Sequence, residues 1–276
     1  MTLTELRNQI VEKRSFLCIG LDVDLEKIPA SLHQEEDPIF AFNKAIIDNT
    51  HHLAVAYKPN TAFYEAYGLR GWKALQKTIT YLKENHPEIF VIADAKRGDI
   101  GNTSTRYAKA FFEEFPCDAI TIAPYMGRDS VEPFLEFKDK YAILLGLTSN
   151  PGSLDFQMQQ VEEEALFEKV IRTALDWDNS QHLMFVIGAT KPEYFQNVRK
   201  IAPNNFLLVP GVGAQGGELK EVCKYGLNED CGLLINSSRG IIYASSKEDF
   251  AETAAEKAKS LQQEMETILE AKGFFE

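Results

Sequence analysis

The sequence predicts an α/β protein whose single domain, residues 1–276, folds as a (β/α)8 TIM barrel. Three observations favour this fold: eight short apolar runs recur along the chain, segments with helical patterning follow them, and polar residues collect where the runs end. Near-continuous apolar strands are typical of parallel sheets covered on both faces. Eight such β-then-α units in one chain indicate a closed barrel. An open, doubly wound sheet also alternates strands with helices and is the alternative.

The elements follow one another along the whole chain. The predicted strands cover residues 16–24, 52–60, 89–97, 119–124, 141–148, 183–190, 205–212 and 231–239. The clearest helices cover residues 63–85 and 162–177, with acids early and bases late. The last helix, within residues 245–273, has candidate serine caps at its start and stops at Gly273. The connection over residues 150–181 is longer than most, and we expect it to include a mobile loop over the fifth strand.

Composition and charge narrow the possible partners. The formal net charge of -12 argues against nucleic acid or an anionic membrane as a partner. No stretch approaches the ~20 uninterrupted apolar residues that a membrane span requires, and residues 1–16 lack the apolar core of a signal peptide. The four cysteines form no CxxC pair, so we expect reduced thiols and a cytoplasmic protein.

The polar residues at the strand ends mark a candidate site, because the active site of such a barrel lies at the carboxyl ends of its strands. The residues in question are Asp22, Asp24, Lys58, Asn60, Asp94, Lys96, Pro124, Thr148, Ser149, Pro210, Gly211, Ser237, Ser238 and Arg239. Asp94 and Lys96 are two apart on one predicted strand, so their side chains share a face. Asp99 lies just beyond, in a loop or first helical turn. A structural network of ion pairs is the alternative interpretation of these charges.

The acids around Lys96 indicate what this lysine can do. A lysine that forms a Schiff base needs its neutral form favoured, whereas Asp94 and Asp99 favour the ammonium form of Lys96. Lys96 is therefore suited to giving a proton to a carbanion. Asp94 would repel a substrate carboxylate, and that repulsion ends when the carboxylate leaves as carbon dioxide. The pattern fits decarboxylation with protonation of the same carbon.

A glycine-rich stretch follows the seventh predicted strand. In "PGVGAQGGE", Gly211, Gly213 and Gly216 spell GxGxxG. A dinucleotide site requires this motif after an early strand, whereas a barrel binds phosphate with the loops after strands seven and eight. Arg239, at the end of the eighth run, would supply forked donors to the phosphate. An ordinary glycine turn and a surface arginine are the alternative.

The remaining polar features carry less information. Ser149, in "GLTSNPGS", could contact the polar edge of a ring or could simply cap a turn. The histidines are His33, His51, His52, His86 and His182. Their spacing is not that of metal ligands, so we expect surface or structural roles for them. The sequence predicts no metal site.

Together these motifs resemble the orotidine 5'-phosphate decarboxylase family, in its longer bacterial subgroup. "DAKRGDIGNTS" is similar to the family signature D-x-K-x-x-D, with Asp94, Lys96 and Asp99 in its three fixed places. Lys58 in "VAYKPN" matches the lysine that ends the second strand, and Asp22 in "GLDVD" matches the first-strand acid. "TSNPGS" resembles the pyrimidine-contacting loop, and "PGVGAQGG" with the later arginine resembles the phosphate-binding elements. The resemblance covers essentially the whole chain.

The resemblance implies conversion of orotidine 5'-phosphate to UMP and carbon dioxide in de novo pyrimidine synthesis, without a metal or an organic cofactor. It also implies a homodimer with shared active sites, into which Asp99 and Thr103 of one chain reach from the neighbouring subunit. Lys96 would protonate C6 of the pyrimidine, Asp94 would face the carboxylate, and Lys58 with Asp99 would hold Lys96 and the ribose hydroxyls.

The other implied contacts bind the nucleotide and close the site. Asp22 would bind ribose and Ser149 the pyrimidine, while Gln215 and Arg239 would bind the phosphate. Pro210, Gly211 and Gly213 would form the backbone around that phosphate. The loops that carry Ser149 and Gln215 would close over the ligand.

Two other functions remain open from the sequence. Magnesium-dependent relatives, such as 3-keto-gulonate 6-phosphate decarboxylase or hexulose phosphate synthase, share the D-x-K-x-x-D strand but use an acid near the end of the second strand. This chain has Lys58 there, which would repel a dication. A non-catalytic nucleotide-binding protein that kept the fold is the third possibility.

Overall fold

Eight parallel strands form a closed barrel in the hydrogen-bonded order β1-β10-β9-β8-β5-β4-β3-β2. The computed structural model describes residues 1–212 and 218–275. The barrel strands are β1 Leu17–Gly20, β2 Ala56–Lys58, β3 Phe90–Arg97, β4 Ala119–Ile122, β5 Tyr141–Leu147, β8 Leu183–Ile187, β9 Leu207–Pro210 and β10 Leu233–Ser237. Each lies within one of the eight predicted runs. The predicted barrel is therefore confirmed, and closure excludes the open, doubly wound sheet.

Helices follow the strands, and a short hairpin was not foreseen. The α-helices are α1 Leu3–Lys13, α2 Pro38–Thr50, α3 Thr61–Glu65, α4 Gly68–Asn85, α5 Gly101–Lys109, α6 Arg128–Leu135, α7 Leu166–Leu175, α8 Tyr194–Ile201, α9 Leu219–Gly226, α10 Arg239–Ile242 and α11 Phe250–Ala271. Shorter helical turns are η1 Ala30–Gln34, η2 Ala110–Glu114, η3 Pro151–Leu154 and η4 Ser180–His182. In the long connection after β5, β6 Gln160–Val161 and β7 Glu164–Ala165 pair antiparallel.

All three predicted helices differ in detail from the structure. The helix expected over residues 162–177 begins only at Leu166, because the β6–β7 hairpin takes its first four residues. The helix expected over residues 63–85 is divided into α3 and α4, because Gly68 has a φ of 59° that interrupts regular helical backbone. The expected serine caps of α11 are wrong: Asp249 is the N-cap, and the hydroxyl of Ser245 donates to its carboxylate instead. The predicted stop is confirmed, since α11 ends just before Gly273, whose φ is 78°.

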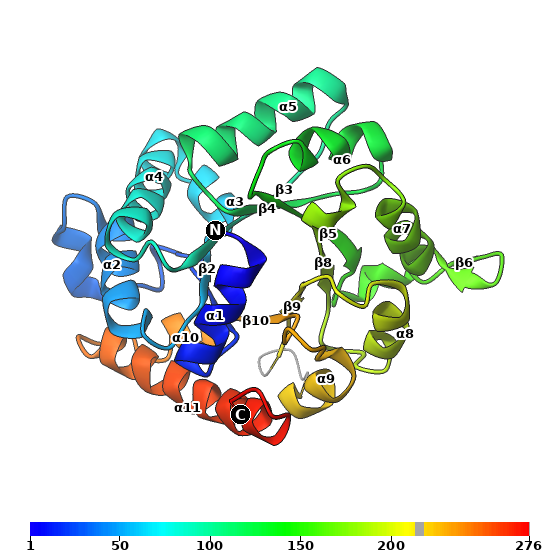
Figure 1. Cartoon of the computed structure of the whole chain (residues 1–276). Coiled ribbons are helices and arrows are strands. Elements are labelled where there is room, and N and C mark those ends of the chain that lie inside the picture. Colours follow the sequence, from blue (N-terminus) through cyan, green and yellow to red (C-terminus); the bar gives the residue numbers. More distant parts are fainter. Residues whose placement is uncertain (213–217, 276) are drawn as a thin grey trace. The chain divides into compact units, whose positions relative to one another are not determined.

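The chain divides into two compact units, and each is described by itself. The first unit consists of Met1–Ala95, Phe115–Cys117 and Asn236–Glu276, and the second of Lys96–Glu114 and Asp118–Ile235. In the first unit α2 packs against both α4 and α11 (Figure 1). The ring of Phe42 on α2 stacks on that of Phe250 with centroids 5.1 Å apart. Large apolar rings of this kind contribute most of the buried area in a core.

The strand register in the first unit sets which residues meet at the strand ends. Gly20 of β1 pairs with Lys58 of β2, and beyond β2 an isolated bridge pairs Asn60 with Asp94 of β3. The ends of β1 and β2 therefore lie nearly level with Asp94 of β3, as the candidate site requires.

In the second unit a half-buried arginine, Arg199, joins three segments of backbone. Arg199 of α8 donates to the carbonyl oxygens of Asn205, Gly226 and Gly232 at 2.6–2.8 Å. These bonds satisfy backbone acceptors before β9, at the end of α9 and before β10. Guanidinium is suited to this task because its five donors have fixed directions.

The structure also bears on two expectations from composition. All four cysteines, Cys18, Cys117, Cys223 and Cys231, are free and buried, which confirms the expected thiols. Within residues 1–212 and 218–275, none of the helices combines the length and apolar character needed to cross a membrane.

Candidate active site

A buried ion pair lies at the strand ends of the first unit. Nζ of Lys58 is 2.7 Å from Oδ2 of Asp94, and the two residues are 4% and 8% exposed. Burial alone would lower the pKa of Lys58, but the carboxylates of Asp94 and Asp22 outweigh it and hold this pKa above the ordinary lysine value. Lys58 is therefore a fixed positive charge inside the site.

Asp22 places an unused acceptor beside this pair. Its Oδ1 atom is buried and has no hydrogen-bond partner among the described residues. The loop that carries it is held by Tyr243, whose hydroxyl donates to the backbone oxygen of Asp22 and accepts from the N–H of Asp24. A buried acceptor without a partner costs free energy unless a ligand donates to it. Asp22 is therefore suited to binding a ligand hydroxyl.

The predicted phosphate arginine follows a tightly packed serine. Arg239 is exposed and begins α10 directly after Ser238. A Cβ atom on Gly20 would lie 1.7 Å from Oγ of Ser238, so only glycine leaves room for this serine. Nδ2 of Asn236 donates to the same Oγ at 3.3 Å, and Sγ of Cys18 donates to Oδ1 of Asn236 at 3.6 Å. Sequence reasoning named Ser238 but missed Gly20, Asn236 and Cys18 as its supports, because no motif marks them.

In the second unit Lys96 has an unusual backbone. Lys96 is exposed, and its φ is 47°, in the left-handed region that favours glycine. Its N–H donates to Oγ1 of Thr121, a buried residue of β4, at 2.9 Å. Such conformations cost free energy and concentrate at functional sites. Because the backbone leaves the extended region here, strand alternation alone does not give the direction of this side chain.

Asp99 lies in the loop between β3 and α5, one of the two places predicted for it. Its Oδ1 accepts from the N–H of Ile100 at 2.7 Å, and its carbonyl oxygen accepts from the hydroxyl of Ser104. Thr103 is exposed on α5. The second acid of the signature is thus held by its own loop, and Thr103 faces solvent.

The backbone of Ser149 packs against Gly188, a second position where a side chain does not fit. A Cβ atom on Gly188, just after β8, would lie 2.8 Å from the backbone nitrogen of Ser149. The preceding N–H, of Thr148, donates to Oε1 of Gln157 at 2.8 Å. The loop after β5 is therefore braced from two sides, and neither Gly188 nor Gln157 was singled out from the sequence.

Part of the predicted phosphate site is described. Pro210 ends β9, and its carbonyl oxygen accepts from the N–H of Ala189. Gly211 has a φ of 97°, which requires glycine there. Gly213 and Gln215 lie outside the described residues.

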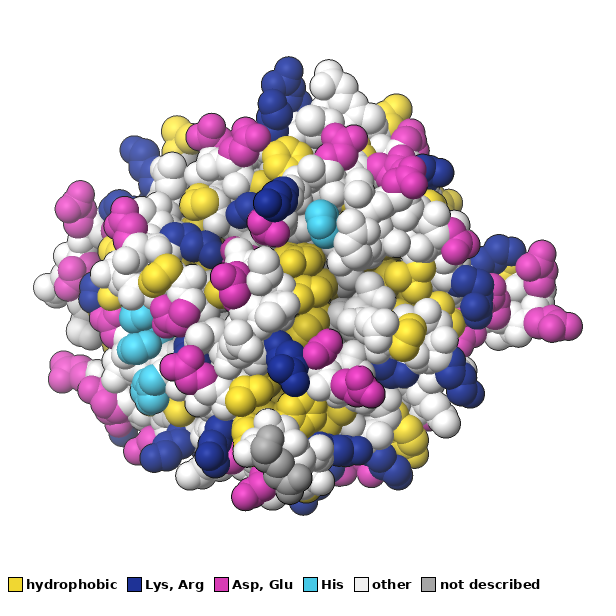
Figure 2. All heavy atoms as spheres, in the orientation of Figure 1, with side chains coloured by type: hydrophobic (Ala, Val, Ile, Leu, Met, Phe, Trp, Pro, Cys, Tyr) yellow, Lys and Arg dark blue, Asp and Glu magenta, His cyan; other side chains and the backbone are white. Residues whose placement is uncertain are grey.

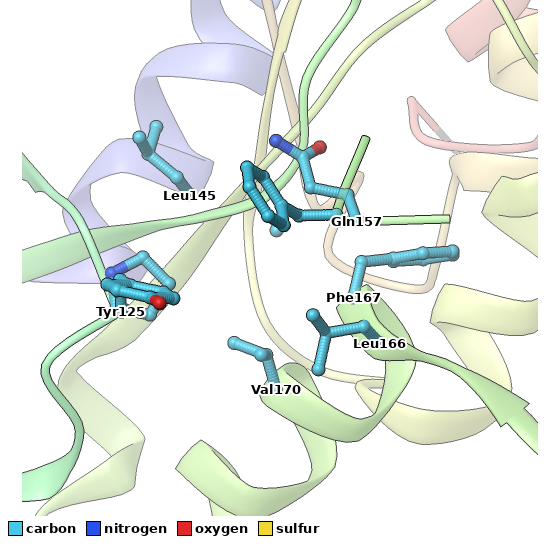
Figure 3. Close-up of a pocket in the computed structure, with 9 residues that line it drawn as sticks. Tyr125, Leu145, Gln157, Leu166, Phe167 and Val170 are labelled. Atoms are coloured by element: carbon cyan, nitrogen blue, oxygen red, sulfur yellow. The ribbon is translucent and has the colours of Figure 1, made fainter. Parts of the chain in front are cut away.

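A separate apolar cavity of about 450 Å³ lies beside the loop after β5, in the second unit. Its lining residues are Pro124, Tyr125, Leu145, Gly146, Phe156, Gln157, Leu166, Phe167 and Val170. In Figure 3 Tyr125 and Leu145 lie on one side and Phe167, Leu166 and Val170 on the other. The lining holds no carboxylate and no ammonium group, so it lacks the groups that the predicted reaction needs.

The predicted site residues therefore fall into two sets. The first unit brings Lys58 and Asp94 into contact, with Asp22 close enough to act on Lys58. The second unit holds Lys96, Asp99 and Ser149, and the described contacts of Lys96 and Ser149 are made mainly by their backbones. The assembly of both sets around one substrate stays a prediction.

Comparisons with known proteins agree with the motifs. Residues 15–254 match the family model described as Orotidine 5'-phosphate decarboxylase / HUMPS family. A protein of Flavobacterium johnsoniae named orotidine 5'-phosphate decarboxylase is 62% identical over 272 residues, which cover 99% of this chain and 100% of that protein. A protein of the same name from Christiangramia forsetii is 63% identical over 270 residues, covering 98% and 99%.

A solved structure extends the similarity to the fold. The structure of Leishmania donovani OMP decarboxylase is 38% identical, covers 97% of this chain and 99% of its own, and superposes with a TM-score of 0.83. The match of the family model to most of the chain and the near-complete coverage of the relatives lead to the same result. The chain belongs to the orotidine 5'-phosphate decarboxylase / HUMPS family.

Proposed function

We propose that the protein decarboxylates orotidine 5'-phosphate to UMP and carbon dioxide, without a cofactor, in de novo pyrimidine synthesis. The observation that carries this proposal is the buried pair of Lys58 and Asp94 at the strand ends, with an unpartnered oxygen of Asp22 beside it. The chain aligns over nearly its whole length with relatives named for this activity, and this similarity supports the same substrate.

In the proposed step Lys96 is the proton donor. The bond between C6 and the carboxylate carbon breaks, its electron pair stays on C6, and carbon dioxide leaves. An N–H proton of the Lys96 ammonium passes to C6, and water later returns a proton to the amine. The strained backbone of Lys96 supports a functional role, since φ values of this kind cost free energy and persist where a site needs them.

The buried pair would set the charges around the reacting carbon. Asp94 faces the substrate carboxylate and repels it until it leaves, while Lys58 keeps Asp94 ionised and in place. A lysine at the end of β2 also argues against the magnesium-dependent sugar-phosphate reactions of the wider family. Its buried ammonium would repel a dication at the position where those enzymes carry an acid.

The nucleotide would be held at three points. Oδ1 of Asp22 accepts from a ribose hydroxyl, which supplies the partner that this buried atom lacks. Ser149 contacts the pyrimidine. Arg239 and Gln215, with the backbone of Pro210, Gly211 and Gly213, bind the phosphate.

We also propose a cytoplasmic homodimer in which residues 1–276 form one catalytic domain. Asp99 and Thr103 would enter the partner's site. Large apolar side chains beside the loop that carries Asp99 are exposed and would be buried by a second copy: Ile100 is 57% exposed, and Met126, whose methyl group lies beside Gly98, is 46% exposed. The free, buried cysteines suit a reducing compartment.

The first experiment follows the loss of orotidine 5'-phosphate absorbance with and without EDTA. We expect rapid loss that EDTA does not change. Lys96→Ala should abolish turnover and keep UMP binding, while Lys109→Ala, which removes an exposed lysine of α5, should leave turnover unchanged. No turnover by the folded protein would contradict the function, and turnover by Lys96→Ala would contradict the proton donor alone.

A further inference from the structure

A cluster of histidines and one glutamate lies in the first unit, among the residues that precede β2 and β3. His51 follows α2, His86 follows α4, and Glu88 lies in the turn before β3. One ligand atom from each of the three side chains lies within 4.8 Å of the other two. Figure 2 shows histidine side chains gathered on this face of the molecule. We propose that His51, His86 and Glu88 bind a divalent transition-metal ion of the Zn²⁺ type.

The three residues are held by regular backbone hydrogen bonds. The N–H of His51 donates to the carbonyl of Ile47, and that of His86 to the carbonyl of Leu82, at 2.9 and 2.8 Å. The N–H of Ile89 donates to the carbonyl of His86, which closes the turn around Glu88. The backbone of the site is thus set by two helix ends and one turn, so only side-chain rotation is needed to bring the ligands together.

The ligand types select the metal. Two imidazoles and one carboxylate suit Zn²⁺, Cu²⁺ or Ni²⁺ better than Mg²⁺ or Ca²⁺, which prefer oxygen. The rings of His51 and His86 lie with centroids 4.2 Å apart and planes tilted by 30°. Ligand atoms around tetrahedral zinc are about 3.3 Å apart, given bond lengths of ~2.0 Å. Closing from 4.8 Å or less to this separation needs a movement of each side chain smaller than one rotamer change.

The electrostatic surroundings contain both favourable and opposing groups. The carboxyl ends of α2 and α4 both lie at the cluster, and helix carboxyl ends favour cations. Asp48 of α2 brings a carboxylate near the cluster. Burial raises the pKa of Asp48, but hydrogen bonds from Lys44 and Tyr81, with a smaller contribution from the nearby imidazole of His86, hold it below the ordinary aspartate value. Against these, Nζ of Lys13 is 3.8 Å from Oε1 of Glu88 and donates to the carbonyl of His51 at 2.8 Å. Lys13 will weaken metal binding without removing any of the three ligands.

A bound ion would join the ends of α2 and α4 to the turn before β3. An ion that binds the folded state and not the unfolded chain raises stability by mass action. None of the three ligands takes part in the proposed decarboxylation, so turnover in EDTA is expected to persist. The metal site and the proposed function can therefore be tested independently of each other.

The test is a calorimetric Zn²⁺ titration of the full-length protein after dialysis against EDTA. We expect saturation at one ion per chain. His86→Gln and Glu88→Gln should each weaken binding at least ~10-fold, as loss of groups around a bound metal does. The matched control is His52→Gln, because His52 is exposed, neighbours His51 and lies outside the three ligands. This variant should bind Zn²⁺ like the wild type.

A second measurement does not depend on the variants folding. Co²⁺ added to the wild-type protein should give paramagnetically shifted proton resonances from two imidazole rings. The proposal would be overturned if those resonances were absent or if the wild type did not bind Zn²⁺. It would also be overturned if His52→Gln and His86→Gln lost the same amount of Zn²⁺ affinity.

Discussion

Nζ of Lys58 lies 2.7 Å from Oδ2 of Asp94, and both side chains are more than nine-tenths buried. Removing two charges from water costs several kcal/mol per ion, and their attraction does not always repay that cost. A pair of apolar residues could fill the same space without it. The pair is therefore better explained by the chemistry of the site than by stability, and variants can separate the two.

Removing one member of the pair should destabilise the protein, and removing both should not. Asp94→Asn leaves a buried ammonium group without its carboxylate, so the free energy of unfolding should fall by about 3–5 kcal/mol. Lys58→Met with Asp94→Leu leaves no buried charge at either position and should regain most of that loss. Both proteins should lack decarboxylase activity. Urea unfolding and turnover measure the two effects, and activity in the double variant would assign the pair to structure.

Gly20 should control the phosphate end of the site. In Gly20→Ala the new methyl group displaces Ser238 and with it Arg239, because the space beside Oγ is filled. We expect kcat/KM to fall on the order of 100-fold, the effect of a displacement of about 1 Å. UMP binding should weaken more than uridine binding.

A second substitution provides the control for Gly20→Ala. Ser238→Gly in the Gly20→Ala background removes the colliding atoms and should restore part of kcat/KM. If Gly20→Ala weakens the binding of UMP and of uridine equally, the substitution does not act on the phosphate site.

Alkaline pH should destabilise the fold through its buried thiols. Burial raises the pKa of Cys18 and of Cys231 to about 12. The unfolded thiols ionise first, so unfolding releases protons above pH ~8.5 and the free energy of unfolding falls by roughly 2 kcal/mol per thiol at pH 10. This contribution is fully present below pH ~8.5 and is lost as pH rises toward 12.

Urea unfolding at pH 7, 8.5 and 10 measures the effect. Cys18→Ala and Cys231→Ala should each make this decline in the free energy of unfolding shallower. A decline that neither substitution changes would contradict the assignment.

Shared active sites can be tested by mixing inactive chains. If Asp99 acts in the partner's site, a hybrid of Lys96→Ala and Asp99→Ala chains contains one intact site. Equal mixing should then restore about a quarter of the wild-type activity, since half of the symmetric dimers are hybrids. Mass spectrometry verifies the exchange of subunits. Each variant alone remains inactive, and no recovery after verified exchange would argue that Asp99 serves its own chain.

The sequence predicted the features that follow from residue pattern, and it did not predict the features that follow from side-chain packing. The apolar runs gave all eight barrel strands, and the charges after them gave Lys58 and Asp94, because parallel strands end together. Nothing in the pattern marked Gly20, whose importance is the absence of an atom beside Ser238. His51 and His86, which we propose as metal ligands, were expected to have surface or structural roles. Their positions in the chain do not have metal-ligand spacing, and only the fold brings them together.

Because Lys96 has a left-handed backbone, the residue that is best for stability at this position differs from the residue that the proposed activity needs. A φ of 47° costs a lysine conformational free energy that it does not cost a glycine. Lys96→Gly should therefore raise the urea midpoint above that of Lys96→Ala, and selection for stability alone would replace the proposed proton donor. Directed evolution for thermal tolerance, run without a requirement for turnover, is expected to lose this lysine early.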